Sequence, residues 1–63
     1  MSQNDELLQA YWNTLDTYTP GRQISRFGKA DAIESVCKSR PVTLYNVEML
    51  CANAGVERGD LRL

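Results

Sequence analysis

The chain has 63 residues, of which 7 are lysine or arginine and 8 are aspartate or glutamate, so its net charge at pH 7 is −1. It has no histidine and two cysteines, which leaves too few ligands for a tetrahedral zinc site and removes the commonest general base. We therefore expect no enzymatic activity, no cofactor, no bound metal and no small-molecule substrate. A chain of this length forms one domain and buries only about 60% of the surface that its unfolded state exposes, so we treat residues 1–63 as a single domain.

The N-terminal stretch Ser2-Gln3-Asn4-Asp5-Glu6 is polar and acidic, with neither a basic flank nor a long apolar run. This composition argues against a signal peptide and a membrane-spanning segment, so we expect a cytoplasmic protein. In a reducing cytoplasm Cys37 and Cys51 are expected to be free thiols that serve as small buried hydrophobic residues. A redox pair is the alternative.

The first helix is expected to run from Ser2 to Tyr18. Ser2 with an acid three residues later matches a capping pattern, and Asp5 and Glu6 suit the positive end of the helix dipole. Thr19-Pro20-Gly21 then favours a turn. Apolar residues recur at helical spacing, and the stripe expected to face the core consists of Leu8, Tyr11, Trp12 and Leu15, widened by Leu7 and Tyr18.

The segment from Arg22 to Phe27 is ambiguous, although Ile24 and Phe27 are three apart and fit one helical turn that packs on the core. Gly28 weakens a helix by about 1 kcal/mol relative to alanine, so we place the second helix from about Ala30 to Ser39. Pro41 disfavours helix at the preceding residue and ends it there. The buried side of this helix is expected to be Ile33, Val36 and Cys37.

The third helix is expected to begin after Thr43, a plausible N-cap, and to end at Gly55, which is free to adopt positive φ. One face is predicted to be buried and consists of Leu44, Val47, Leu50, Cys51 and Ala54. Tyr45 and Met49 lie one turn apart on a second face, which either packs under the first helix or binds a partner. The whole chain is thus predicted to be all-α, a compact three-helix module with a core of Leu8, Trp12, Leu15, Phe27, Ile33, Val36, Leu44, Val47, Leu50 and Cys51.

The charges are distributed unevenly along the chain. Residues 1–19 carry three acids and no base, residues 20–40 carry five bases and two acids, and residues 41–63 carry two bases and three acids. Either these segments neutralise one another, or the basic middle contacts phosphates or an acidic partner. The candidate nucleic-acid-binding residues are Arg22, Arg26, Lys29, Lys38, Arg40, Arg58 and Arg62. Lone helical carboxylates such as Glu34 and Glu48 are expected to be solvated.

The stretch Leu50-Cys51-Ala52-Asn53-Ala54-Gly55-Val56, followed by Leu61-Arg62, resembles the helix-turn-helix of excisionase-like and mercury-resistance-type regulators. The resemblance implies that Cys51 lies at the helix crossing, that Gly55 makes the turn, and that Val56 and Leu61 anchor a second helix. In such motifs the second helix reads the major groove. Here Glu57 replaces the expected capping serine or threonine, and the chain ends at Leu63. We therefore predict a truncated helix-turn-helix-like end.

The full-length pattern also resembles the small early proteins of the lambdoid phage exo–xis region, on the acidic start, the Tyr11-Trp12 pair and the stretch Cys51-Ala52-Asn53-Ala54-Gly55. This resemblance implies a non-enzymatic, all-helical protein of the bacterial host cytoplasm that influences the choice between lysis and lysogeny.

Two functions remain open from the sequence. The first is regulation by binding a host or phage protein, or a second copy, with Tyr11, Tyr45 and Met49 as candidate partner-binding residues. The second is DNA binding through the basic middle of the chain. A steep fall in affinity with salt would favour DNA binding.

Overall fold

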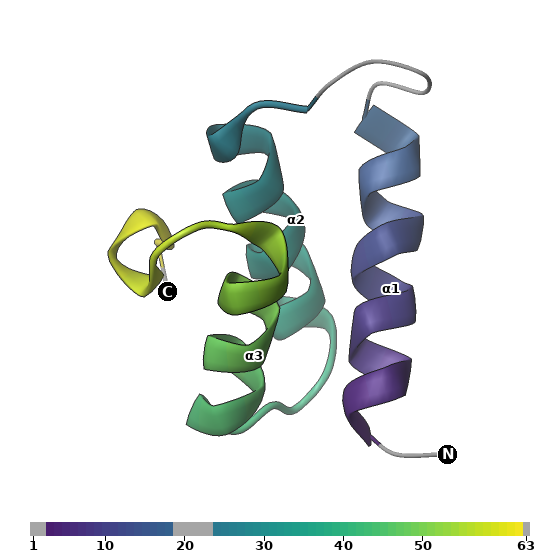
Figure 1. Ribbon diagram of the computed structural model, residues 1–63. Helices are drawn as coiled ribbons and strands as arrows, with labels where there is room; N and C mark the ends of the chain where they lie inside the picture. The colour runs from purple at the N-terminus through teal and green to yellow at the C-terminus, as the bar shows by residue number, and fades with distance from the viewer. Residues whose placement is uncertain (1–2, 19–23, 63) are drawn as a thin grey trace.

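The computed structural model describes residues 3–18 and 24–62. It contains three α-helices, α1 (Gln3–Tyr18), α2 (Arg26–Ser39) and α3 (Leu44–Ala54), followed by a short 3₁₀ helix, η1 (Arg58–Asp60). The helices α1 and α3 run in the same direction and α2 runs against both, while η1 lies on the side of α2 and α3 away from α1 (Figure 1). The all-α, three-helix prediction is confirmed. The predictions on Ser2, Thr19-Pro20-Gly21, Arg22 and Leu63 lie outside the described residues.

Helix α1 faces the core through a stripe that is shifted by one residue from the prediction. Leu7, Tyr11 and Leu15 are buried, whereas Leu8 is half-buried and Trp12 is 48% exposed. The apolar residues of α1 cover a wide arc, and either stripe satisfies helical spacing. Leu7, Tyr11 and Leu15, which follow one another at intervals of four, are the buried residues because α2 and α3 pack on that side of α1.

Helix α2 begins four residues earlier than predicted. Ser25 is its N-cap, and the Ser25 hydroxyl accepts a hydrogen bond from the Gly28 backbone N–H at 3.1 Å. A Cβ atom added to Gly28 would lie 2.8 Å from Cγ2 of Ile24, so the absence of a side chain lets the chain entering α2 pack closely. The glycine that predicted a helix break therefore serves a packing role in the first turn.

Besides Trp12, two more residues predicted for the core are exposed. Phe27 is 78% exposed because the early start of α2 places it on the face away from α1. Leu44 is also exposed, since it is the first residue of α3 and lies at the end of the bundle. The buried cluster instead includes small residues and consists of Leu7, Tyr11, Leu15, Ala32, Ile33, Val36, Val47, Leu50, Cys51, Ala54 and Val56.

Helix α3 is capped at both ends as the sequence predicts. The Thr43 hydroxyl accepts a hydrogen bond from the Asn46 N–H at 3.2 Å, and the Asn46 side chain accepts one from the Thr43 N–H at 3.0 Å. The buried Asn46 side chain also donates to Oδ1 of Asn4 at 2.7 Å, which ties the start of α3 to the start of α1. At the other end Gly55 has φ of 74° and its N–H donates to the Cys51 carbonyl.

The C-terminal segment folds back onto α2 and α3. Val56 is buried and Leu61 packs against the core, as the prediction of apolar anchors required. Between them Asp60 accepts a hydrogen bond from the Glu57 backbone N–H at 2.9 Å. Arg26 holds the same carboxylate with two hydrogen bonds, from Nε at 2.8 Å and from Nη2 at 2.9 Å. This ion pair joins the start of α2 to η1.

Candidate protein-binding surface

The predicted nucleic-acid-binding residues do not form one basic patch among the described residues. The guanidinium group of Arg26 is bound to Asp60, and that of Arg58 lies 3.3 Å from Oε1 of Glu48. Lys38 and Arg40 lie at the opposite end of α2 from Arg26, and Arg62 follows η1. The structure thus supports neutralisation within the fold for two of the arginines.

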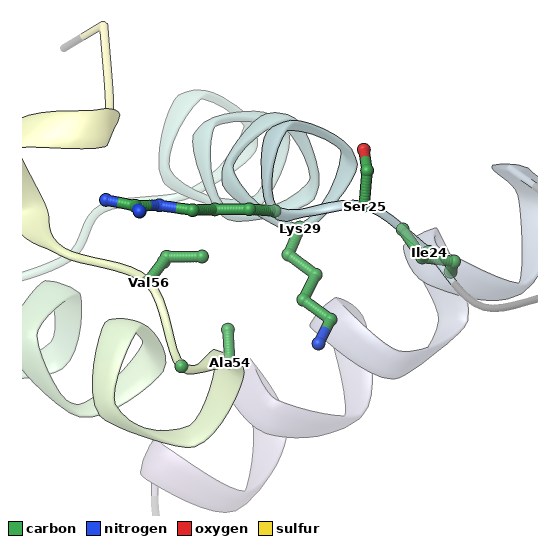
Figure 2. Close-up of a pocket in the computed structure, with 7 residues that line it drawn as sticks. Ile24, Ser25, Lys29, Ala54 and Val56 are labelled. Carbon is green, nitrogen blue, oxygen red and sulfur yellow. The ribbon is translucent and has the colours of Figure 1, made fainter.

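Lys29 lines a hollow of about 410 Å³ between the start of α2 and the end of α3, which Arg26 also lines. Figure 2 shows its side chain pointing from α2 into this hollow, with Ala54 and Val56 on the opposite wall. A helix C-terminus carries partial negative charge, which favours a nearby cation. Gly55, at the end of α3, lines the same hollow as Lys29.

The segment after Gly55 does not form the second helix of a helix-turn-helix. Val56 and Leu61 anchor the chain as the resemblance implies, but the residues between them form only the three-residue helix η1. The hydrogen bond from the Glu57 N–H to the Asp60 carboxylate, described above, stabilises this short turn. Three residues of 3₁₀ helix span about 6 Å, which is too short to lie along a major groove in the way a recognition helix does.

The prediction that Tyr11 binds a partner is wrong. Tyr11 is 1% exposed and belongs to the core, and burial raises the pKa of its phenol. Its neighbour Trp12 is exposed instead, as is Tyr18 at the end of α1, and the ring centroids of Tyr11 and Trp12 are 5.2 Å apart. The sequence missed Trp12 because a large apolar side chain in an amphipathic helix is more often buried.

Tyr45 is on the outer side of α3, whereas Met49 also packs against the core, so the face is partly exposed and partly packed. Tyr45 is 64% exposed, and Met49 is half-buried against the edge of the core. The bond between Asn4 and Asn46 fixes which edges of α1 and α3 meet. Leu8 lies one turn beyond Asn4 and Met49 lies about one turn beyond Asn46, and because α1 and α3 run in the same direction (Figure 1) these two residues lie at the same level of the seam.

We call the residues Leu8, Trp12, Tyr45 and Met49 the α1–α3 surface. Trp12 follows Leu8 by one turn on α1, and Tyr45 precedes Met49 by one turn on α3, so the apolar residues continue along both helices. Neither helix contains a lysine or an arginine within its bounds, whereas the two together contain four acids, Asp5, Glu6, Asp16 and Glu48. The surface is therefore apolar and aromatic, and the charges within α1 are all acidic, whereas Glu48 on α3 is paired with Arg58.

The two cysteines are free thiols, Cys37 half-buried and Cys51 buried. Burial raises the pKa of the Cys37 thiol, and the nearby Cys51 and Glu34 raise it further. Burial also raises the pKa of Cys51, although Arg58 opposes this effect. Because the thiolate is the reactive form, both raised pKa values reduce reactivity at neutral pH, which agrees with packing rather than catalysis.

Glu34 departs from the sequence prediction most clearly. The lone carboxylate was expected to be solvated, yet Glu34 is only 7% exposed. It lies beside the C-terminal segment that includes Asp60 and Leu61. The sequence cannot reveal this position, because the burial of Glu34 depends on how residues 56–62 fold back onto α2.

Within residues 3–18 and 24–62, no group of three histidine, cysteine, aspartate or glutamate residues is arranged to hold a metal ion. No helix in these residues has the length and apolar character needed to cross a membrane. Comparisons of this chain with protein-family models, with curated proteins and with solved structures found no match. The phage and helix-turn-helix resemblances therefore stay predictions from the sequence.

Proposed function

We propose that this protein is a non-enzymatic regulator that acts by binding another protein through the α1–α3 surface. One observation carries the proposal: Trp12 and Tyr45 are exposed on two adjacent helices that carry four acids and no base. Tryptophan and tyrosine are the residues that most often dominate binding energy at protein interfaces. The acids of α1 favour a partner whose apolar patch is flanked by lysine or arginine.

The resemblance to small early phage proteins supplies the biological setting of this proposal. In that setting the partner is a host or phage protein of the bacterial cytoplasm, and binding biases the choice between lytic and lysogenic development. DNA binding stays a prediction from the sequence. The ion pairs of Arg26 and Arg58 weaken its basis, since they occupy two of its candidate contacts.

The proposal is tested by comparing three immobilised forms of the protein in extracts of the cells that produce it. We expect the wild type to retain a specific protein, and the variant Tyr45→Ala/Met49→Ala to lose it. The matched control is Lys38→Ala/Arg40→Ala, which changes two exposed residues outside the surface and should retain the same protein. Retention by the apolar variant, or loss only in the basic variant, would contradict the proposal.

A second measurement tests the DNA alternative directly. A mixed-sequence duplex is titrated into the protein at low and at moderate salt, and the backbone amides are followed by NMR. The protein-binding proposal predicts an unchanged spectrum. Shifts confined to residues 24–40 and 56–62 that fade with salt would favour DNA binding instead.

A further inference from the structure

A second candidate site lies on the other side of the molecule, between α2 and the C-terminal segment. A groove of about 390 Å³ runs between them, to which α2 contributes Phe27, Asp31 and Glu34, and the segment after α3 contributes Asp60, Leu61 and Arg62. This side of α2 faces away from α1 (Figure 1), so the groove is separate from the α1–α3 surface.

Glu34 is the unusual feature of this groove. The residue is more than nine-tenths buried, yet within the described part of the chain its carboxylate has neither a hydrogen bond nor an ion pair. Among the described residues, every side-chain oxygen that solvent cannot reach has a hydrogen-bond partner. Because the Glu34 oxygens have no such partner, they are accessible to solvent. The groove that Glu34 lines supplies this opening. A ligand that donates hydrogen bonds to this carboxylate would replace the water that solvates it.

The neighbouring residues define the chemistry of such a ligand. Phe27 lies two turns before Glu34 along α2 and is the most exposed large apolar residue described, while Asp31 lies between them. The Asp60 carboxylate is already bound to Arg26. The groove therefore offers an aromatic ring at one end, a recessed carboxylate at the other and a second carboxylate beside them.

We propose that this groove binds an arginine side chain of a partner protein. The guanidinium group would bind the Glu34 carboxylate with two parallel hydrogen bonds, a geometry that suits this pair of groups. Its aliphatic stem would pack toward the ring of Phe27. Arginine fits better than lysine because its charge is planar, more weakly hydrated and able to form two parallel hydrogen bonds with a carboxylate.

The test uses N-acetylarginine amide as the probe and N-acetylcitrulline amide as its neutral counterpart, because citrulline keeps the shape of arginine without the charge. Binding to the full chain is followed by NMR at the Glu34 carboxyl carbon and the Phe27 ring. We expect saturable shifts at both groups with the arginine probe and none with the citrulline probe. Equal shifts with the two probes would overturn the proposal.

Variants then locate the site. Glu34→Gln keeps the side-chain shape and should weaken binding of the arginine probe about tenfold or more, since one charge-assisted contact is lost. Glu6→Gln removes the same charge from the exposed surface of α1 and should bind as the wild type does. Phe27→Leu should weaken binding because the aromatic face is lost, and Arg62→Ala should strengthen it by removing a nearby positive charge.

The proposal fails if Glu34→Gln, shown by circular dichroism to be folded, binds the arginine probe as tightly as the wild type. It also fails if Arg62→Ala weakens binding, because a cationic ligand is repelled by Arg62. Sedimentation of the wild type without probe separates a foreign partner from a second copy. A monomer agrees with the proposal, whereas a dimer that Glu34→Gln dissociates would overturn it.

Discussion

The α1–α3 surface and the groove between α2 and the C-terminal segment both expose an aromatic side chain, but they differ in the residues that surround it. Beside Trp12 and Tyr45 are apolar residues that pack on the core, whereas Phe27 shares its groove with the carboxylates of Asp31 and Glu34. The first region is suited to a broad apolar contact and the second to a single cationic side chain. The difference shows that exposure of an aromatic residue does not by itself define a binding site, because its polar surroundings decide what it can bind.

The largest predicted effect is the difference in stability between variants of Tyr11 and Trp12, two adjacent aromatic residues in α1. Tyr11→Ala removes a fully buried ring and should lower the free energy of unfolding by about 3 kcal/mol or more. That loss is comparable to the whole stability of a chain this small. Trp12→Ala removes a half-exposed side chain and should lower it by only about 1 kcal/mol.

Urea unfolding followed by circular dichroism measures both variants. If Trp12→Ala proved as destabilising as Tyr11→Ala, Trp12 would be a core residue, and the α1–α3 surface would lose its main aromatic contact.

Asn46 provides the next prediction, since it fixes the register between α1 and α3. Asn46→Ala removes half of the capping box and the bond to Asn4, and should lower the free energy of unfolding by about 2 kcal/mol. The control is Asn53→Ala on the same helix, because the exposed Asn53 side chain bonds only within α3. Thermal unfolding of the two variants gives the comparison, and equal losses would show that the link between the helices contributes nothing.

Gly28→Ala is predicted to lower the free energy of unfolding, whereas helix propensity alone predicts that it raises it. In an open helix, Gly→Ala stabilises by up to about 1 kcal/mol. Here the added methyl group would lie 2.8 Å from Ile24, so Gly28→Ala should lower the free energy of unfolding by about 1 kcal/mol through overpacking. Gly28→Ala combined with Ile24→Ala should recover part of that loss in chemical denaturation. A stabilised single variant would contradict the packing role of this glycine.

The smallest predicted effect concerns the ion pair beside the groove. The Glu57 N–H and then the Arg26 guanidinium hold the pKa of Asp60 below its ordinary value. Because the pKa is lower in the folded state, the contribution of Asp60 to stability is present above about pH 4 and is lost as the pH falls through the folded value. NMR titration should show η1 loosening only in acid, and Arg26→Gln should move this transition to higher pH. A wild-type Asp60 that titrates at its ordinary value would rule out this contribution.

The sequence predicts the helices better than it predicts their faces. The end of α1, the end of α2 and both caps of α3 follow from local signals such as Pro41, Thr43 and Gly55. The start of α2 does not, because the role of Gly28 depends on its contact with Ile24. The choice between Tyr11 and Trp12 depends on where the other helices lie, and so no local pattern reveals it.

The candidate sites were harder to predict for the same reason. Tyr45 and Met49 follow from helical spacing within α3 alone. Glu34 becomes distinctive only when the C-terminal segment covers it, and Phe27 only when the start of α2 is known. Both depend on contacts between segments that are distant in the chain.

The central claim is that the α1–α3 surface is where this protein meets its partner. Photo-crosslinking tests it most directly, with benzoylphenylalanine placed at Tyr45 or, as a control, at Lys38, in cells that produce the protein. If the partner binds the α1–α3 surface, position 45 gives a protein adduct that disappears when Trp12→Ala is added, and position 38 gives no such adduct. Adducts of equal yield from both positions, or an adduct that persists without Trp12, would contradict it.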